Sequence, residues 1–341
     1  MNKSMILPST QLCLILSMFF ALVIHADFYT LQPPTYSEVI TNPSSSFVRF
    51  LIQSLAVVYI DLFVITLGWA GIQMKLQDFG GFIFQCLFYT IGIYFVIVLL
   101  GYQPFSTSKI LESIGLAKNM WCIKSLLFLF ILLPILNQWC ESTNEKLQRN
   151  VLIGFFIFQT IYAWFNMATT FFVDGYSGVS FIGLYLLGKY IKKHPKNKYF
   201  NLSSLSNFLI YTFICLFITI SSFISQRIGI EYVPFRMYSY INPLVIIAAV
   251  YLLLGITKLN IRFKWLQPFA VSCFSVYLFT NNPNIMDPFF VPITKNLYNN
   301  HSGVYCILII TAFCLAIYLL ITLIDQLRIL TWRHVNKMLI K

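Results

Sequence analysis

Charged side chains are scarce in this chain: they make up 10% of its 341 residues, and only 11 are acidic. A soluble domain carries about 25% charged residues, so this chain has too little charge to cover a surface that faces water. Hydrophobic residues account for 58% of the sequence, and the longest polar stretch, 27–46, is too short for a separate folded domain. The composition predicts an integral membrane protein in which residues 1–341 form a single transmembrane domain.

The sequence also lacks the motifs of several common enzyme classes. It contains no phosphate-binding loop, no GxSxG elbow, no HExxH and no cluster of carboxylates typical of a metal site. The eight cysteines show neither a CxxC pair nor a Cys/His spacing, so we expect small core residues, with no disulfide and no metal. The two halves do not repeat one another, which argues against an inverted-repeat transporter.

What the chain has in abundance is apolar runs of about 20 residues, the length that suits a bilayer core about 30 Å thick. They predict an all-α, polytopic bundle of about ten transmembrane helices. We count the ten runs at 10–26, 47–72, 79–101, 119–137, 150–172, 176–191, 203–225, 237–256, 265–285 and 303–326.

The net charge of +12 comes mostly from basic residues in alternate loops and in both tails. This positive-inside pattern predicts cytoplasmic N- and C-termini, and it indicates contact with anionic membrane lipid and no nucleic-acid partner. The first 26 residues are similar to a signal peptide ending at Ala26. Ile24, however, stands where a cleavage site prefers a small residue, so we expect this segment to be retained.

Ionisable residues inside apolar spans are costly, so each is a candidate for function. Asp61 lies well within the second run, where either a structural hydrogen bond or a catalytic role would explain it. His25 directly follows the first apolar run, either as an interfacial cap or as a functional imidazole. Near the end of the last run, Asp325 is expected to pair with Arg328 in a helix-surface contact worth little.

Two sets of basic residues outside the predicted spans each have a structural and a functional interpretation. Arg227 and Arg236 flank tyrosines in a predicted outer loop, which suits an ordinary loop or a site for a sugar or an acidic sugar. The stretch 189–198 reads as a cytoplasmic stop signal or as a surface for an anionic ligand such as a phosphate-bearing cofactor. Its candidate cofactor-binding residues are Lys189, Lys192 and Lys193.

Five stretches, taken in order, resemble the membrane acyltransferase family 3, whose members have ten spans. The closest similarity is to Bacteroides-type cell-surface polysaccharide O-acetyltransferases. The stretches are IDLFVITLGWAGI (60–72), WCIKSLLFLFILLPILN (121–137), GYSGVSFIGLYLLGKYIKKH (175–194), YSYINPLVIIAAVYLL (238–253) and SCFSVYLFTNNPNI (272–285).

The resemblance implies an enzyme of the bacterial inner membrane that transfers an acyl group, usually acetyl, from cytosolic acetyl-CoA to a hydroxyl of a cell-envelope polysaccharide or lipid-linked glycan. It places His25 at the family's histidine, as general base or acyl relay, with Asp61 as a second catalytic candidate. Trp121 and Tyr277, in two of the matching stretches, join Arg227 and Arg236 as candidate acceptor-binding residues.

The chain departs from the family pattern at two positions. Leu14, eleven residues before His25, stands where the family has arginine, and Thr280 stands where close relatives have histidine. These differences leave a catalytically degenerate homologue, acting as a scaffold or glycan binder, as an alternative. A polysaccharide polymerase or export protein is a further alternative, although such proteins have longer outer loops.

Overall fold

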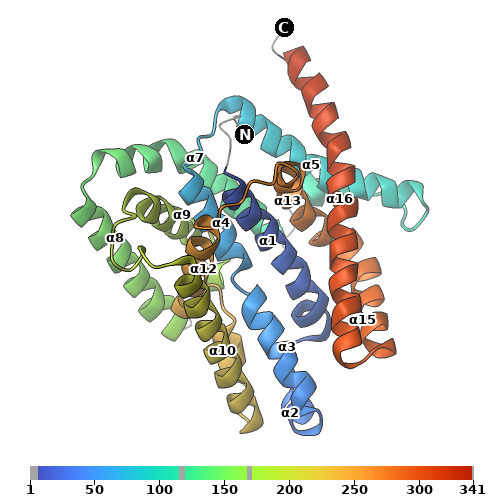
Figure 1. Ribbon diagram of the computed structural model, residues 1–341. Helices are drawn as coiled ribbons and strands as arrows, with labels where there is room; N and C mark the ends of the chain where they lie inside the picture. Colours follow the sequence, from blue (N-terminus) through green and yellow to red (C-terminus); the bar gives the residue numbers. More distant parts are fainter. Residues whose placement is uncertain (1–6, 115–119, 167–170, 340–341) are drawn as a thin grey trace.

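A computed structural model describes residues 7–114, 120–166 and 171–339, and every regular element in these ranges is helical (Figure 1). The elements are α1 (Pro8–Ile24), η1 (His25–Tyr29), α2 (Tyr36–Thr41), α3 (Pro43–Ala56), α4 (Tyr59–Ala70), α5 (Leu76–Leu99), α6 (Thr107–Ile114), α7 (Trp121–Ser142), α8 (Glu145–Phe158), η3 (Gln159–Phe165), η4 (Val173–Gly175), α9 (Gly178–Lys193), α10 (Ser204–Arg227), α11 (Tyr232–Met237), α12 (Pro243–Thr257), α13 (Leu266–Thr280), α14 (Pro283–Ile285), η5 (Met286–Phe290), α15 (Val291–Asn300) and α16 (Gly303–Leu339).

The predicted all-α fold is confirmed, and the protein is a helical membrane protein. Among the described residues, six helical segments are long and apolar enough to cross a membrane: α1 with η1, α3 with α4, α5, α7, α10 and α16. Helices α12 and α13 are apolar but shorter. The runs expected at 150–172 and 176–191 correspond to α8 with η3 and to α9, which are not among these segments, so the count of ten stays a prediction.

Helix α1 lies at the centre of the bundle (Figure 1). It packs against α4 and α13, and also contacts α3, α12 and α16. The side chains of Cys13, Met18 and Leu22 are completely buried by these neighbours. About half of the first helical segment is therefore buried against protein, and His25, which directly follows α1, lies in the interior.

Helices α4 and α9 approach each other closely because glycine removes the side chain on both sides. A Cβ atom added at Gly68 would lie 2.1 Å from the carbonyl oxygen of Tyr185, and one added at Gly188 would lie 2.1 Å from that of Ile65. Small residues at such crossings let helix backbones touch in membrane proteins. This contact fixes α4, which carries Tyr59 at one end and Gly71 at the other, against α9.

The break between α3 and α4 at Val57 and Val58 is stabilised by α10. The last carbonyl groups of a helix lack partners within the helix. Here the hydroxyl of Tyr211 donates to the carbonyl of Leu55 at 2.7 Å, and the thiol of Cys215 donates to that of Ser54 at 3.3 Å. Side chains of α10 thus complete the hydrogen bonding of the interrupted helix.

Asp325 and Arg328 form a bidentate ion pair, with both contacts at 2.7 Å, but the expected surface location is wrong. Asp325 is completely buried and Arg328 is 7% exposed. The carboxylate also accepts hydrogen bonds from Ser275 at 2.6 Å and from Tyr89 at 3.1 Å. The sequence showed the pair but not the neighbouring helices α5 and α13, which enclose it.

Candidate active site at His25

The backbone that carries His25 is a π-helix, η1, which continues α1 without a break. Single turns of π-helix occur frequently at functional sites. The hydroxyl of Thr30 donates to the carbonyl of His25 at 2.7 Å. Arg49 of α3 holds the same turn through Asp27, with its Nε donating to Oδ1 at 2.7 Å, and also donates to the carbonyl of Gln32. These three contacts therefore hold η1 and the residues that follow it, and η1 carries the imidazole of His25.

The imidazole of His25 is almost completely buried, with 5% of the side chain exposed. Its ring centre lies 6.0 Å from that of Tyr29, 6.4 Å from that of Tyr277 and 6.5 Å from that of Phe290. Its Nδ1 atom is buried and has no hydrogen-bond partner among the described residues. A buried polar atom without a partner is costly, so this nitrogen is suited to binding or accepting a proton from a ligand.

His25 lines a cavity of about 330 Å³ that opens between α1, α4, α7, α13 and the segment around α11. Its walls are mainly aromatic, with an amide at one position. The lining residues are Ile24, His25, Phe28, Tyr29, Val57, Tyr59, Trp121, Tyr176, Tyr238, Tyr240, Tyr277 and Asn281.

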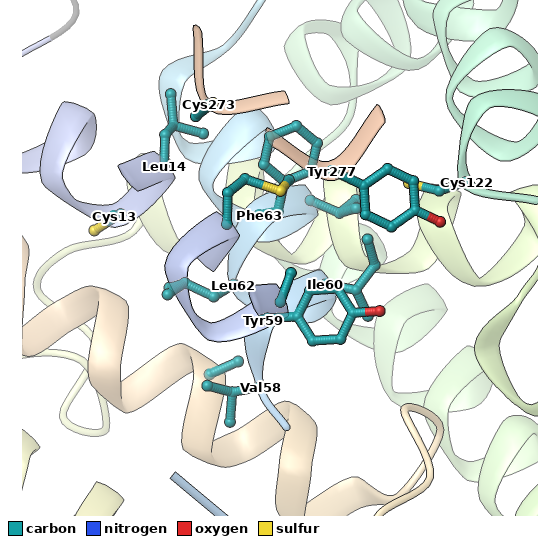
Figure 2. Close-up of a cluster of buried hydrophobic side chains, with 14 of the residues drawn as sticks. Cys13, Leu14, Val58, Tyr59, Ile60, Leu62, Phe63, Cys122, Cys273 and Tyr277 are labelled. Carbon is teal, nitrogen blue, oxygen red and sulfur yellow. The ribbon is translucent and has the colours of Figure 1, made fainter. Parts of the chain in front are cut away.

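The aromatic side chains that form the walls of the cavity pack against one another. Trp121 packs edge-on against Tyr176, with ring centres 4.5 Å apart, and stacks against Tyr240 at 6.3 Å. The hydroxyl of Tyr240 donates to that of Tyr59 at 3.1 Å. Figure 2 shows the hydroxyl groups of Tyr59 and Tyr277 directed to the same side. Rigid apolar faces with a few hydroxyl groups are the usual surroundings of a small polar organic ligand.

Two of the predicted acceptor-binding residues, Trp121 and Tyr277, therefore share a cavity with His25. Asn281, which follows α13, donates to the hydroxyl of Tyr277 at 3.0 Å and lines the same cavity. The proximity of these residues is a fact of the fold, while their roles stay predictions.

Leu14, at the position where the family has arginine, lies in the apolar core with 3% of its side chain exposed. Figure 2 shows it beside Cys13, Cys273 and Phe63. Thr280 is also buried, and its hydroxyl donates to the carbonyl of Val276 at 2.9 Å. Both departures from the family pattern are thus accommodated as core positions.

Asp61 is completely buried on α4 but does not line the cavity. Neither of its carboxyl oxygens has a hydrogen-bond partner among the described residues. It lies one helical turn before Ile65, which contacts α9. Asp61 is therefore not one of the residues that surround His25 in the cavity, and a catalytic role for it stays a prediction.

The three candidate cofactor-binding lysines lie near the far end of α4. The Nζ atom of Lys189 is 3.7 Å from the position that a Cβ of Gly71 would occupy. Tyr59, at the start of α4, lines the His25 cavity, whereas Gly71 directly follows the end of α4. A helix rises about 18 Å between these two positions. Lys193 donates to the carbonyl of Cys140 at 2.6 Å, and Lys192 lies 4.6 Å from the ring centre of Trp69. These lysines are not part of the His25 cavity.

Arg227 and Arg236 do not line the cavity either. Arg227 is exposed at the end of α10. Arg236 is tied to the region of η3, because Trp164 donates to its carbonyl at 2.9 Å and its own guanidinium contacts the carbonyl of Phe165 at 3.5 Å. The tyrosines that follow, Tyr238 and Tyr240, are the part of this segment that reaches His25.

The chain matches the family model of an acyltransferase domain, acyltransferase 3, over residues 12–322. The comparison with curated proteins and that with solved structures gave no match. The matched region begins just before Leu14 and includes His25 and every other residue that lines the cavity.

Proposed function

Since the chain belongs to the acyltransferase 3 family, we propose that it is an O-acyltransferase of the bacterial inner membrane, and specifically an O-acetyltransferase. The donor would be acetyl-CoA from the cytosol, and the acceptor a hydroxyl of a cell-envelope polysaccharide or lipid-linked glycan. The observation that carries this proposal is the unpartnered imidazole nitrogen of His25, buried in a cavity with aromatic walls.

The proposed reaction uses His25 as a general base. The sugar hydroxyl loses its proton to the imidazole while its oxygen attacks the thioester carbonyl of the donor. Collapse of the tetrahedral intermediate breaks the carbon–sulfur bond and leaves the acyl group on the sugar oxygen. The imidazolium then returns the proton to the departing thiolate. Trp121 and Tyr277 would hold the acceptor in the cavity, and Asn281 would orient the hydroxyl of Tyr277.

The donor would enter from the side of Lys189, Lys192 and Lys193. These lysines lie about 18 Å along α4 from the cavity, so the donor must be long enough to bridge the distance. Saturating acetyl-CoA should protect the 189–198 segment from protease in inside-out vesicles. Unchanged cleavage would contradict this donor site but would leave the role of His25 intact.

The decisive experiment is proton NMR of surface polysaccharide from a strain that lacks the gene and carries either wild type or a variant. Wild type should restore the O-acetyl signals, and His25→Ala should nearly abolish them, because a general base contributes roughly 10²- to 10⁴-fold to the rate. His334→Ala is the matched control, because His334 is exposed on α16. Equal acetylation by wild type and His25→Ala would refute catalysis by His25.

A second candidate is a non-catalytic relative that binds the glycan. The observation that favours it is Leu14, an apolar side chain that is 3% exposed and packed in the hydrophobic core at the position where the family has arginine. It would be supported if deletion abolished glycan modification while His25→Ala left it unchanged.

A further inference from the structure

A second groove, with a volume of about 720 Å³, lies between α8 with η3, α9 and the segment that follows α9. It shares no lining residue with the His25 cavity. One side is formed by Arg149, Ile153, Ile157 and Ile161, which recur at every fourth position and therefore lie along one helix face. The groove thus follows a helix that carries a cation at its start and apolar side chains beyond it.

The side chains of these three isoleucines are more exposed than large apolar side chains usually are on a surface that faces water. Ile153 is 51% exposed, Ile157 is 54% exposed and Ile161 is 58% exposed. A continuous apolar patch of this kind marks a contact with a membrane or a partner. From Arg149 to Ile161 the helix rises about 18 Å, slightly more than half of a 30 Å bilayer core. This length fits a single acyl chain of one leaflet.

The charge at one end of the groove is positive. Arg149 is exposed there, beside Asn197 and Tyr199. The Nζ atom of Lys198 lies 5.0 Å from the ring centre of Tyr199, and so brings a second cation to the same end. The nearest acidic residue in sequence, Glu145, lies 3.4 Å from His194 and also interacts with Tyr190 of the groove lining, so one carboxylate offsets part of the charge of the two cations. Such a basic end attracts an anionic headgroup, because basic residues near a membrane surface favour anionic lipid.

We propose that this groove binds an anionic phospholipid. Its phosphate lies beside Arg149 and Lys198, and one acyl chain lies along Ile153, Ile157 and Ile161. The site holds a lipid of the leaflet in which α8 begins, which the charge distribution assigns to the cytoplasmic side. It is separate from the acyl-transfer site and does not depend on the proposed reaction.

Native mass spectrometry of the purified full chain tests this, with phosphatidylglycerol and phosphatidylcholine of the same acyl chains added at equal concentration. Wild type should retain more phosphatidylglycerol. Arg149→Ala should lower that retention about fivefold, the effect of one basic residue near an anionic surface. Arg333→Ala, the same change at an exposed position of α16, should have no such effect. Ile157→Trp fills the groove and should reduce retention of both lipids.

Equal retention of the two lipids by wild type would refute the proposal, as would equal losses for Arg149→Ala and Arg333→Ala. The matched control for groove filling is Leu323→Trp, at a residue of α16 that is 68% exposed. Equal effects of the two tryptophan variants would show that the bound lipid is not in this groove. If Ile157→Trp does not elute as a single species in size-exclusion chromatography, the comparison of the two arginine variants decides the test.

Discussion

At the scale of single residues, the ion pair of Asp27 and Arg49 joins the η1 turn that carries His25 to α3. Arg49 is 12% exposed and Asp27 is 3% exposed, so replacing the arginine leaves a buried carboxylate without its partner. We expect Arg49→Gln to lower the free energy of unfolding by about 3–5 kcal/mol. Thermal unfolding in detergent measures this loss.

A double-mutant cycle separates the ion pair from other effects of removing Arg49. The variant carrying both Asp27→Asn and Arg49→Gln has no buried unpaired charge, so it should be more stable than Arg49→Gln alone. Additive losses from the two substitutions would show that the pair does not hold the η1 turn.

Leu14 permits a second prediction at this scale. Restoring the family's arginine by Leu14→Arg places a guanidinium among the apolar side chains of the core, at a position that is 3% exposed, so we expect less folded protein and no gain in acetylation. Leu7→Arg makes the same change at the residue that directly precedes this helix and is 56% exposed, and it should be tolerated. Size-exclusion chromatography and polysaccharide NMR provide the two measurements. Increased acetylation in Leu14→Arg would show that the arginine pocket still exists.

At the scale of helices, α4 and α9 make a close backbone contact at Gly68 and Gly188. We expect Gly188→Ala to destabilise the protein by at least about 1–3 kcal/mol, because the new methyl group would lie 2.1 Å from the carbonyl oxygen of Ile65. Gly154→Ala is the matched control: no atom lies within 4 Å of its Cβ position, and alanine favours helix by about 1 kcal/mol. Unfolding midpoints that shift equally would contradict the close packing.

The sequence predicts the helices of this protein better than it predicts the contacts between those helices. Apolar runs indicate helices because each run must bury its backbone polar groups within itself, and six of these runs correspond to helices that can cross a membrane. The resemblance placed His25, Trp121 and Tyr277 in separate segments, and the fold brings them to one cavity. Their juxtaposition depends on how distant helices pack, which no local pattern encodes.

The site residues that the sequence did not identify also depend on contacts between distant parts of the chain. Tyr59 and Tyr176 line the cavity, but in a chain with 20 tyrosines neither stands out, whereas Tyr240 was noted only as a neighbour of the two loop arginines. The partners Asp27 and Arg49 are separated by 22 positions, so no local pattern in the sequence indicated that they pair. The sequence does show that several spans carry a tyrosine near one end. This observation indicates a shared site only once the structure shows that these span ends lie together.

At the scale of the whole molecule, the direction of the chain across the membrane follows from α16. Its 37 residues extend about 55 Å, which exceeds a 30 Å bilayer core and leaves one end in water. α1 begins and α16 ends at the top of Figure 1, whereas α10 ends at the bottom. The basic residues near the end of α16 predict that this end lies in the cytoplasm.

Cysteine labelling in intact cells tests this orientation, because all eight native cysteines are buried and should react little. We expect a membrane-impermeant maleimide to modify Ile228→Cys, just beyond α10, in intact spheroplasts. Met338→Cys, near the end of α16, should react only after the membrane is permeabilised. Both positions are exposed and uncharged, at 65% and 72%, so neither substitution alters the charge balance that sets orientation. If both react before permeabilisation, or if the order is reversed, α16 does not end in the cytoplasm, and the lysines of α9 no longer face the supply of acetyl-CoA.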